Sequence, residues 1–174
     1  MKIRASLSED SAAIYELHRN TFDESEAETV AKLACSLLED ASAQPLLSLV
    51  AEQDDRIVGH TLFSHVVINE APSIKAAILA PLGVSTDVQK QGVGTRLIQD
   101  GLQILKEHDV VLVFVYGDPG YYGRSGFSLC SDISAPYTLE HPHGWQVQEL
   151  KEGVLSSTKG TLRCADALMS PDLW

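Results

Sequence analysis

The stretch from Leu82 to Leu105 constrains the fold more than any other part of the chain. It opens at the end of a short apolar run, 76–84, which predicts a buried strand. A polar turn follows, and Gly92 and Gly94 then begin a segment whose apolar residues recur at spacings of three and four. That spacing predicts an amphipathic helix over 92–108. Its apolar face consists of Leu97, Ile98, Gly101, Leu102 and Leu105.

This order of strand, glycine-containing turn and helix predicts an anion site at the start of the helix. Glycine lets a ligand approach the backbone, and the first-turn N–H groups have no partner inside the helix. Phosphate is the natural ligand. A Walker loop fits poorly, because Gly94 is followed by Thr95-Arg96 and not by Lys and Ser or Thr. A dinucleotide fingerprint fits poorly as well, because it needs a glycine where this chain has Leu97.

The residues before this stretch predict a strand, two helices and three antiparallel strands. Ser8 is a candidate N-cap for the first helix, and Ser25 with Glu28 forms a capping-box pattern at the start of the second. The second helix carries an apolar stripe that we expect to pack on a sheet: Ala27, Val30, Ala31, Ala34, Leu37, Leu38 and Ala41. The expected ranges are an edge strand at 2–6, helices at 8–20 and 25–41, strands at 46–53 and 56–69, and a third strand starting near Ile74.

After the helix at 92–108, the apolar run Val110–Tyr116 predicts a central strand buried on both faces. A strand, a helix and a second strand in succession form a βαβ unit, so the strand ending at Val84 and this strand should run parallel. Asp118 is expected to cap a short helix that has Pro119 at its first position. A last strand is expected at 145–150, and the chain from 153 onward gives no clear pattern.

Composition narrows the class of protein. The 174 residues are 44% hydrophobic and 21% charged, as in a globular protein of one domain. No apolar run reaches about 18 residues and no signal-peptide core is evident, so we expect a cytoplasmic protein. The net charge of −11 argues against a nucleic-acid partner and an anionic membrane surface. It is compatible with a cationic amine substrate and equally with a surface that keeps the protein soluble.

No metal site is predicted. Cys35, Cys130 and Cys164 are widely spaced and are expected to be reduced structural thiols. His60 and His65 lie five residues apart on one predicted strand and would face opposite sides, so each is expected to be a partly buried, hydrogen-bonding histidine. The segment His141-Pro142-His143 has no acidic residue nearby and is interpreted as a loop.

Two blocks of sequence resemble the GNAT superfamily of acyl-CoA-dependent N-acyltransferases. The segment Gln89-Lys90-Gln91-Gly92-Val93-Gly94 is similar to its (Gln/Arg)-x-x-Gly-x-(Gly/Ala) pyrophosphate loop, and Tyr122–Phe127 is similar to its Tyr-x-x-x-Gly-Phe segment. The fuller GDPGYYGRSGF, the IVGHTLFS at 57–64 and the PLGV that ends the fourth strand resemble the bacterial YhbS-like branch. The resemblance covers roughly residues 2 to 130.

The resemblance implies a mixed α/β (α+β) fold. Its sheet would be twisted and mostly antiparallel, with a central parallel pair formed by the fourth and fifth strands and helices on its faces. One acetyltransferase domain would span 1–174, with 131–174 beyond the range of the resemblance. The implied activity is transfer of an acetyl group from acetyl-CoA, by direct attack, to a primary amine of a small molecule or peptide. A homodimer is compatible with the sequence.

The resemblance also assigns the residues of the site. The backbone of the loop would bind the pyrophosphate, with Lys90 or Arg96 offering charge, and a backbone N–H near Val84 would polarise the thioester carbonyl. Tyr122 would lie near the sulfur and donate a proton to it, the alternative being a ring packed beside Phe127. Tyr121 would point about 100° away from Tyr122 on a helical segment. The assigned cosubstrate-binding residues are Leu82, Gly83, Val84, Gln89, Lys90, Gln91, Gly92, Val93, Gly94, Thr95 and Tyr122.

One departure from the family pattern leaves the mechanism open. Many members carry a Glu on the fourth strand that deprotonates the amine, whereas this chain has only small and apolar residues from Ala76 to Val84. The general base lies elsewhere, is replaced by water and backbone, or is absent. An acyl-CoA-binding sensor or interaction module with a decayed active site is therefore an alternative function. A conventional nucleotide-binding protein is a third.

Overall fold

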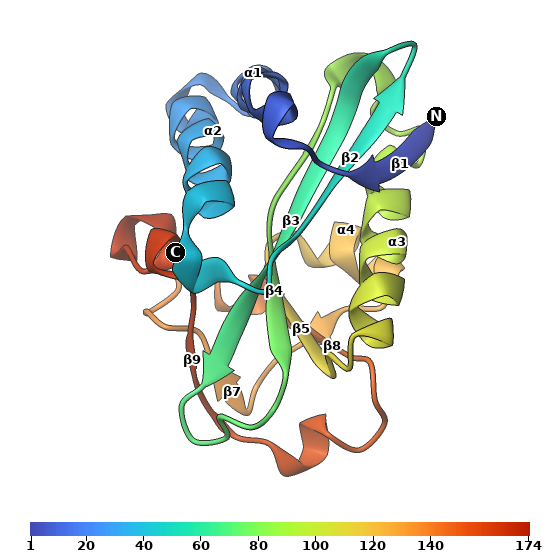
Figure 1. Ribbon diagram of the computed structural model, residues 1–174. Coiled ribbons are helices and arrows are strands. Elements are labelled where there is room, and N and C mark those ends of the chain that lie inside the picture. The colour runs from blue at the N-terminus through green and yellow to red at the C-terminus, as the bar shows by residue number, and fades with distance from the viewer.

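The computed structural model describes residues 1–174 and confirms the mixed α/β fold (Figure 1). One sheet runs through the molecule in the order β1-β2-β3-β4-β5-β8-β6, with β9 paired to β3 and to β7. The strands are β1 (Lys2–Ala5), β2 (Leu47–Gln53), β3 (Arg56–Ile68), β4 (Ala76–Val84), β5 (Leu112–Tyr116), β6 (Ser128–Leu129), β7 (Ile133–Ser134), β8 (Trp145–Glu149) and β9 (Gly160–Arg163). The helices are α1 (Ser11–Thr21), α2 (Glu24–Glu39), α3 (Val93–Glu107) and α4 (Pro119–Tyr122).

The predicted parallel pair is present at the centre of the sheet. β4 and β5 run parallel, while every other neighbouring pair in the main sheet is antiparallel. The pairing of β4 with β5 covers only Ala76 to Ile78 on β4. From Leu79 to Val84, β4 continues beside β3 alone, so the two central strands splay apart. The backbone of β4 is therefore available to a ligand on the side that faces β5.

A β-bulge at Ala80 and Pro81 changes the direction of the side chains on β4. Thr61 pairs with Leu82 and Phe63 with Leu79, so one residue of β3 opposes two residues of β4. In a regular strand Ile78 and Leu82 would share a face. Here Ile78 packs in the core beneath α1 and α2, and Leu82 packs against the core beneath α3. The bulge thus turns the end of β4 toward α3.

Helices cover both faces of the sheet (Figure 1). The apolar face of α3 lies on β2, β3 and β4, with Leu97 and Ile98 fully buried, and α1 and α2 cover the opposite face. Gly101 is required by this packing, because a Cβ there would collide with the ring of Phe63. The predicted stripe on α2 is buried at Ala27, Ala31, Ala34 and Leu37, whereas Ala41 lies beyond the helix and is exposed.

Two predicted helix starts were wrong. Ser8 begins a 3-10 turn, and the local cap is the carboxylate of Asp10, which accepts the backbone N–H of Leu7. Asp10 is held in place by Arg4, whose guanidinium binds it at 2.7 and 3.1 Å. Helix α2 begins at Glu24, before Ser25, and Glu28 accepts a hydrogen bond from Tyr15 in place of closing a capping box. The start of β4 is also later than Ile74, at Ala76.

The C-terminal segment, which gave no clear pattern, packs into the core beneath α2. β9 pairs with the end of β3 through Val67 and Ile68. Leu168 is buried in the large core cluster, and Trp174 stacks on Tyr116 with ring centroids 6.2 Å apart. The end of the chain lies beside the end of α2 (Figure 1). Short 3-10 turns connect these contacts, which explains why no helical or strand period was visible.

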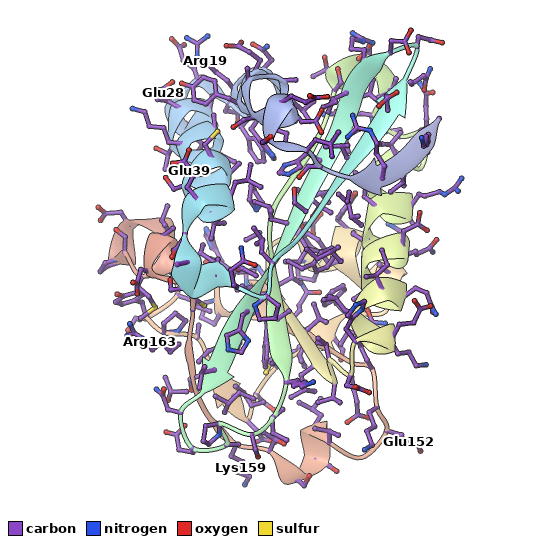
Figure 2. All side chains as sticks on the ribbon, in the orientation of Figure 1. Arg19, Glu28, Glu39, Glu152, Lys159 and Arg163 are labelled. Carbon is purple, nitrogen blue, oxygen red and sulfur yellow. The ribbon has the colours of Figure 1, made fainter.

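Charged side chains lie on the outside of the molecule (Figure 2). On α1 and α2, Arg19, Glu28 and Lys32 form exposed ion pairs. Cys35, Cys130 and Cys164 are free thiols, and burial raises the pKa of Cys164 to about 12. None of the helices is long and apolar enough to cross a membrane.

Candidate active site

The loop between β4 and α3 presents backbone N–H groups at the start of a helix. Lys90 and Gly92 both have left-handed backbones, with φ of 62° and 84°. Gly92 is the N-cap residue, and the first intrahelical hydrogen bond runs from Arg96 N–H to its carbonyl at 3.0 Å. The N–H groups of Val93, Gly94 and Thr95 therefore have no helical acceptor. Nothing lies within 4 Å of the place where a Cβ of Gly92 would be, so a ligand can reach this backbone closely.

A cavity of about 670 Å³ lies over this loop and extends to the splayed end of β4. Its only charged lining residues are Lys90 and Arg124, in a chain whose net charge is −11. A concave site with two cations, helix N–H donors and no carboxylate suits a ligand with several negative charges. The lining residues are Thr21, Phe22, Leu82, Val84, Gln89, Lys90, Gly92, Val93, Gly94, Thr95, Tyr121, Tyr122 and Arg124.

Nine of the eleven residues assigned from the sequence line this cavity, and Gly83 and Gln91 do not. Gly83 faces α1, because the strand alternates there and Leu82 and Val84 face the cavity. Gln91 points back to the carbonyl of Asp87 at 3.2 Å. The suggested role of Arg96 is not supported by its position, since its guanidinium lies toward Asp100 at 3.8 Å and the residue does not line the cavity.

Four lining residues were not assigned from the sequence. Thr21 and Phe22 come from the end of α1, where Thr21 donates a hydrogen bond to Leu17 O at 2.6 Å. No local pattern marks them, because they reach the site only through the packing of α1 on the sheet. Arg124 carries its guanidinium 5.6 Å from the ring centroid of Tyr121, a cation–π contact.

Both tyrosines of α4 line the cavity, and their side chains point to different parts of it. Their ring centroids are 5.1 Å apart and the rings are nearly perpendicular. The hydroxyl of Tyr121 occupies the space where a Cβ of Gly94 would be, which explains why residue 94 is a glycine. The ring of Tyr122 lies over Gly117 at the end of β5 and edge-on to Phe127 at 5.9 Å. The Tyr121 hydroxyl therefore packs against the loop at Gly94, and the Tyr122 ring lies near the place where β4 and β5 splay apart.

The Tyr122 hydroxyl is suited to donating a proton. No protein group makes a hydrogen bond to it, and it is not sealed from the cavity that it lines. Burial, followed by the neighbouring Tyr121 and Asp118, raises the pKa of Tyr122 well above its usual range. The side chain is consequently neutral and protonated at pH 7. As predicted, Asp118 caps α4 by accepting the N–H of Gly120 at 2.9 Å.

A buried histidine pair lies on the other face of β4 at Gly83. His18 on α1 and His60 on β3 are fully buried, and a hydrogen bond of 2.7 Å joins Nε2 of His18 to Nδ1 of His60. Burial lowers the pKa of His18 to about 4 and lowers that of His60 as well, so both rings are neutral at pH 7. The predicted hydrogen-bonding role of His60 is confirmed. His18 was not singled out, because nothing in its helix marks it.

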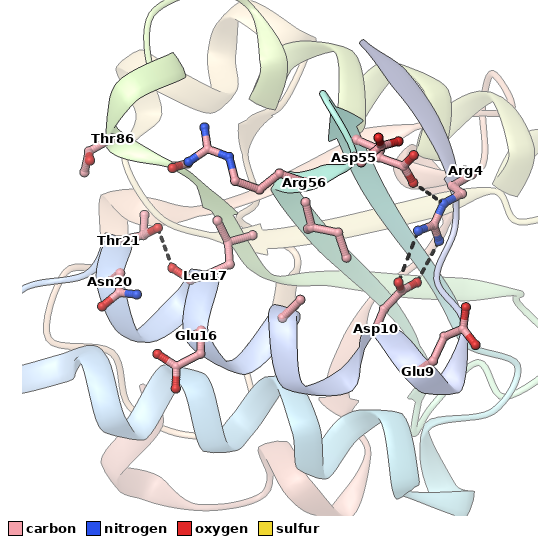
Figure 3. Close-up of a pocket in the computed structure, with 14 residues that line it drawn as sticks. Arg4, Glu9, Asp10, Glu16, Leu17, Asn20, Thr21, Asp55, Arg56 and Thr86 are labelled. Atoms are coloured by element: carbon pink, nitrogen blue, oxygen red, sulfur yellow. Dashed lines mark hydrogen bonds and ion pairs between the residues drawn. The ribbon is translucent and has the colours of Figure 1, made fainter.

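A second cavity, of about 460 Å³, lies between α1 and the β2–β3 hairpin (Figure 3). Arg4 and Asp10 point toward one another inside it, and Arg4 also binds Glu52 at 2.8 Å. This arginine holds the pKa of Asp10 below its usual range. The cavity shares Thr21 with the first one but holds carboxylates from Glu9, Glu16 and Asp55. It is thus unsuited to a polyphosphate.

His141 and His143 are exposed and lie beside Asp118 at a third cavity, with their ring centroids 6.0 Å apart. The backbone N–H of His141 donates to the hydroxyl of Tyr116 at 3.0 Å. No three His, Cys, Asp or Glu side chains gather closely enough to hold a metal ion.

The acetyltransferase (GNAT) domain model matches residues 2–130, and the chain therefore belongs to the GNAT family of acyl-CoA-dependent acetyltransferases. Among its relatives, the N-acetyltransferase YjhQ of Escherichia coli K12 is 42% identical over 142 residues, which cover 78% of each chain. YhbS of the same strain is 36% identical over 163 residues, covering 92% of this chain and 93% of the relative. Both relatives are uncharacterised, so the family is established and the acceptor is not.

Solved structures agree with the fold and with the YhbS-like branch. YhbS from Escherichia coli in complex with CoA superposes with a TM-score of 0.87 and 28% identity, covering 97% of this chain and 92% of that one. A GNAT acetyltransferase from Brucella melitensis in complex with acetyl-CoA superposes with a TM-score of 0.76 and 26% identity, covering 96% and 97%.

Proposed function

We propose that this protein transfers the acetyl group of acetyl-CoA to a primary amine, with the acyl donor in the cavity over the 89–95 loop. The observation that carries the proposal is the composition of that cavity. It joins helix N–H donors and two cations at one end to a protonated Tyr122 at the splay of β4 and β5. Two relatives of similar fold have been solved with CoA or acetyl-CoA, which supports the same ligand here.

The polyphosphate end of the donor would be held by the backbone. Val93, Gly94 and Thr95 line the cavity with N–H groups that have no helical acceptor, and Lys90 and Arg124 add positive charge. The pantetheine arm would extend along Leu82 and Val84 toward the place where β4 and β5 separate. There the β4 backbone has no strand partner on one side and can donate to the thioester carbonyl.

The chemistry requires one proton to reach the sulfur and one to leave the amine. As the amine nitrogen bonds to the acetyl carbon, the C–S bond breaks and the thiolate takes the proton of the Tyr122 hydroxyl. A tyrosine, with a pKa of at least ~10, is a weaker acid than a thiol, with a pKa near ~8.5, so the transfer is uphill and takes place only as the C–S bond breaks; the Tyr122 phenolate then regains a proton from water. β4 carries no carboxylate that could remove the amine proton.

A CoA-release screen tests the proposal. Wild-type protein is mixed with acetyl-CoA and, in turn, with polyamines, amino acids, aminoglycosides and peptides with free N-termini. Tyr122→Phe should lower kcat by roughly 10²–10⁴-fold with little change in acetyl-CoA affinity, because it removes only the hydroxyl. Tyr137→Phe is a matched control, since Tyr137 lies on the loop after β7, away from this cavity. Equal turnover by the two variants would exclude Tyr122 as the acid.

A second candidate is an acyl-CoA-binding sensor with this fold and no reaction. It is favoured by the lack of a carboxylate from Ala76 to Val84. Tight binding of acetyl-CoA, without CoA release above background for any amine in the panel, would support the sensor and contradict the transferase.

A further inference from the structure

A small apolar cavity lies on the α2 face of the sheet, at the place where β4 and β5 separate. Its volume is about 90 Å³, and all of its lining residues are hydrophobic. Leu33 comes from α2, Ala80 from β4 and Tyr116 from β5, and the C-terminal segment adds Leu173 and Trp174. These five residues are all half-buried, so the cavity opens to solvent and is not a packing defect inside the core.

This apolar cavity adjoins the donor cavity along the open edge of β4. Pairing with β5 ends at Ile78, so β4 has no strand partner on this side from Leu79 onward. The partly exposed residues of β4 are Ala80, Leu82 and Val84. The first of them lines the apolar cavity, and the other two line the donor cavity. An exposed row of residues therefore connects the two cavities.

The two cavities approach this edge from opposite faces of the sheet. Leu82 packs against the core beneath α3, whereas Ala80 packs against the core beneath α1 and α2, because the bulge in β4 lies between them. On β5, Tyr116 packs on the α2 face, and the ring of Tyr122 lies over the next residue, Gly117, on the α3 face. An acyl group beside Leu82 therefore faces, through the gap between the strands, an amine that lies beside Ala80.

The lining of the apolar cavity offers no side chain to pair with a charge. It has two polar side-chain atoms, and each already makes a hydrogen bond. The Tyr116 hydroxyl accepts the backbone N–H of His141 at 3.0 Å, and the indole N–H of Trp174 donates to Leu168 O at 2.9 Å. An ammonium group placed there would lose its water without compensation, whereas methylene and methyl groups gain free energy by leaving water.

We propose that this cavity binds the apolar group of the amine acceptor, and that the acceptor is a primary amine with a short, uncharged hydrocarbon chain. The proposal rests on the acetyl transfer described above and names the class of its second substrate. A volume of about 90 Å³ holds about three groups of the size of a water molecule, which occupies ~30 Å³ in the liquid. A methylene group is of similar size, so about three carbons beyond the carbon that bears the amine fill the cavity.

A matched pair of amines tests the class of acceptor. Butylamine and trimethylenediamine have chains of the same length, and a terminal methyl group in the first replaces a second ammonium group in the second. With acetyl-CoA as donor, kcat/KM should be at least about tenfold higher for butylamine. It should also rise about fourfold per carbon from ethylamine to butylamine, the usual gain for a buried methylene. Equal or higher kcat/KM for the diamine would overturn the proposal.

A substitution in the lining should change this preference. Leu33→Asp supplies a carboxylate to the second ammonium group, so the ratio of the two kcat/KM values should shift at least about tenfold toward the diamine. Leu38→Asp is the matched control, because Leu38 is also half-buried on α2 and packs on the same core but does not line the cavity. A ratio that changes equally in the two variants, or in neither, would overturn the proposal.

Nuclear magnetic resonance measures binding without turnover. Trp174 lines the cavity, so butylamine added at constant pH to the wild-type protein with CoA should shift the indole N–H resonance of Trp174, assigned with Trp174→Phe. Trimethylenediamine at the same concentration should leave this resonance in place. No shift with butylamine, or equal shifts with both amines, would overturn the apolar subsite. A selective shift without turnover of any amine would support the subsite and count against acetyl transfer.

Discussion

Because His18 and His60 are buried, the free energy of unfolding should depend on pH between 7.5 and 5. His18 is fully buried with no charged partner, so burial alone lowers its pKa in the folded protein from 6.5 to about 4. Below pH 6.5 the unfolded chain binds a proton that the native protein does not. The contribution of His18 to stability is therefore complete above pH 6.5 and is lost as the pH falls toward 4.

The size of the effect follows from the two pKa values. The difference between 6.5 and about 4 corresponds to about 3 kcal/mol at the acid limit, and about 2 kcal/mol is lost by pH 5. His60 acts in the same direction, because burial lowers its pKa too. A typical domain is stabilised by about 5–15 kcal/mol, so a loss of ~2 kcal/mol at pH 5 should be measurable.

Urea denaturation followed by circular dichroism at several pH values gives the measurement. The unfolding free energy of the wild type should fall steadily from pH 7 to 5, and His18→Gln should reduce that slope by the share of His18 while the share of His60 remains, even if its stability is lower at every pH. His65→Gln should keep the slope, since His65 is on the same strand but only partly buried. A flat wild-type profile, or an unchanged slope in His18→Gln, would refute the assignment of a neutral buried His18.

Three other substitutions probe separate parts of the structure. Leu37→Ala should cost about 2–5 kcal/mol in urea denaturation, because Leu37 is fully buried on the inner face of α2, and a cost near zero would mean that α2 is not packed on the sheet. Gly94→Ala should weaken acetyl-CoA binding about tenfold in calorimetry by displacing the Tyr121 hydroxyl, and adding Tyr121→Phe should restore part of it, whereas no recovery would refute that contact. Arg4→Met should cost about 1–3 kcal/mol at pH 7 and progressively less as the pH falls below 3.8, since Arg4 lowers the pKa of Asp10 and this stabilisation is lost as Asp10 protonates; a cost that does not change with pH would contradict it.

The sequence was most informative where one element carried a complete local signal. The strand at 76–84, Gly92 at the turn and the period of α3 each depend on residues close together in the chain, so the parallel pair and the loop could be predicted. The positive φ of Gly92 and the close approach of Tyr121 to Gly94 explain the two glycines of the motif. These features depend on backbone geometry that the pattern of glycines already implies.

The remaining features depend on contacts between distant residues. His18 and His60 are 42 positions apart and meet only when α1 packs on β3, so neither helix period nor strand alternation marks them. The bulge at Ala80 and Pro81 reverses the alternation of β4, so Leu82 and Val84 face the cavity and Gly83 faces α1, although all three were assigned to the cosubstrate from the sequence. Ser8 was predicted to be an N-cap. The local geometry depends instead on the ion pair between Arg4 and Asp10, which the pattern of neighbouring residues does not indicate.

Isothermal titration calorimetry with acetyl-CoA tests the central claim most directly. The wild-type protein should bind acetyl-CoA and prefer it to ATP, and Gly92→Val should weaken binding at least about tenfold, or 1.4 kcal/mol, in a variant that remains folded. The reason is that Gly92 has a left-handed backbone, which valine adopts only with strain, and open space above it for a ligand. Unchanged affinity in a folded Gly92→Val protein, or no binding of acetyl-CoA by the wild type, would contradict the assignment of this loop and cavity to the acyl donor.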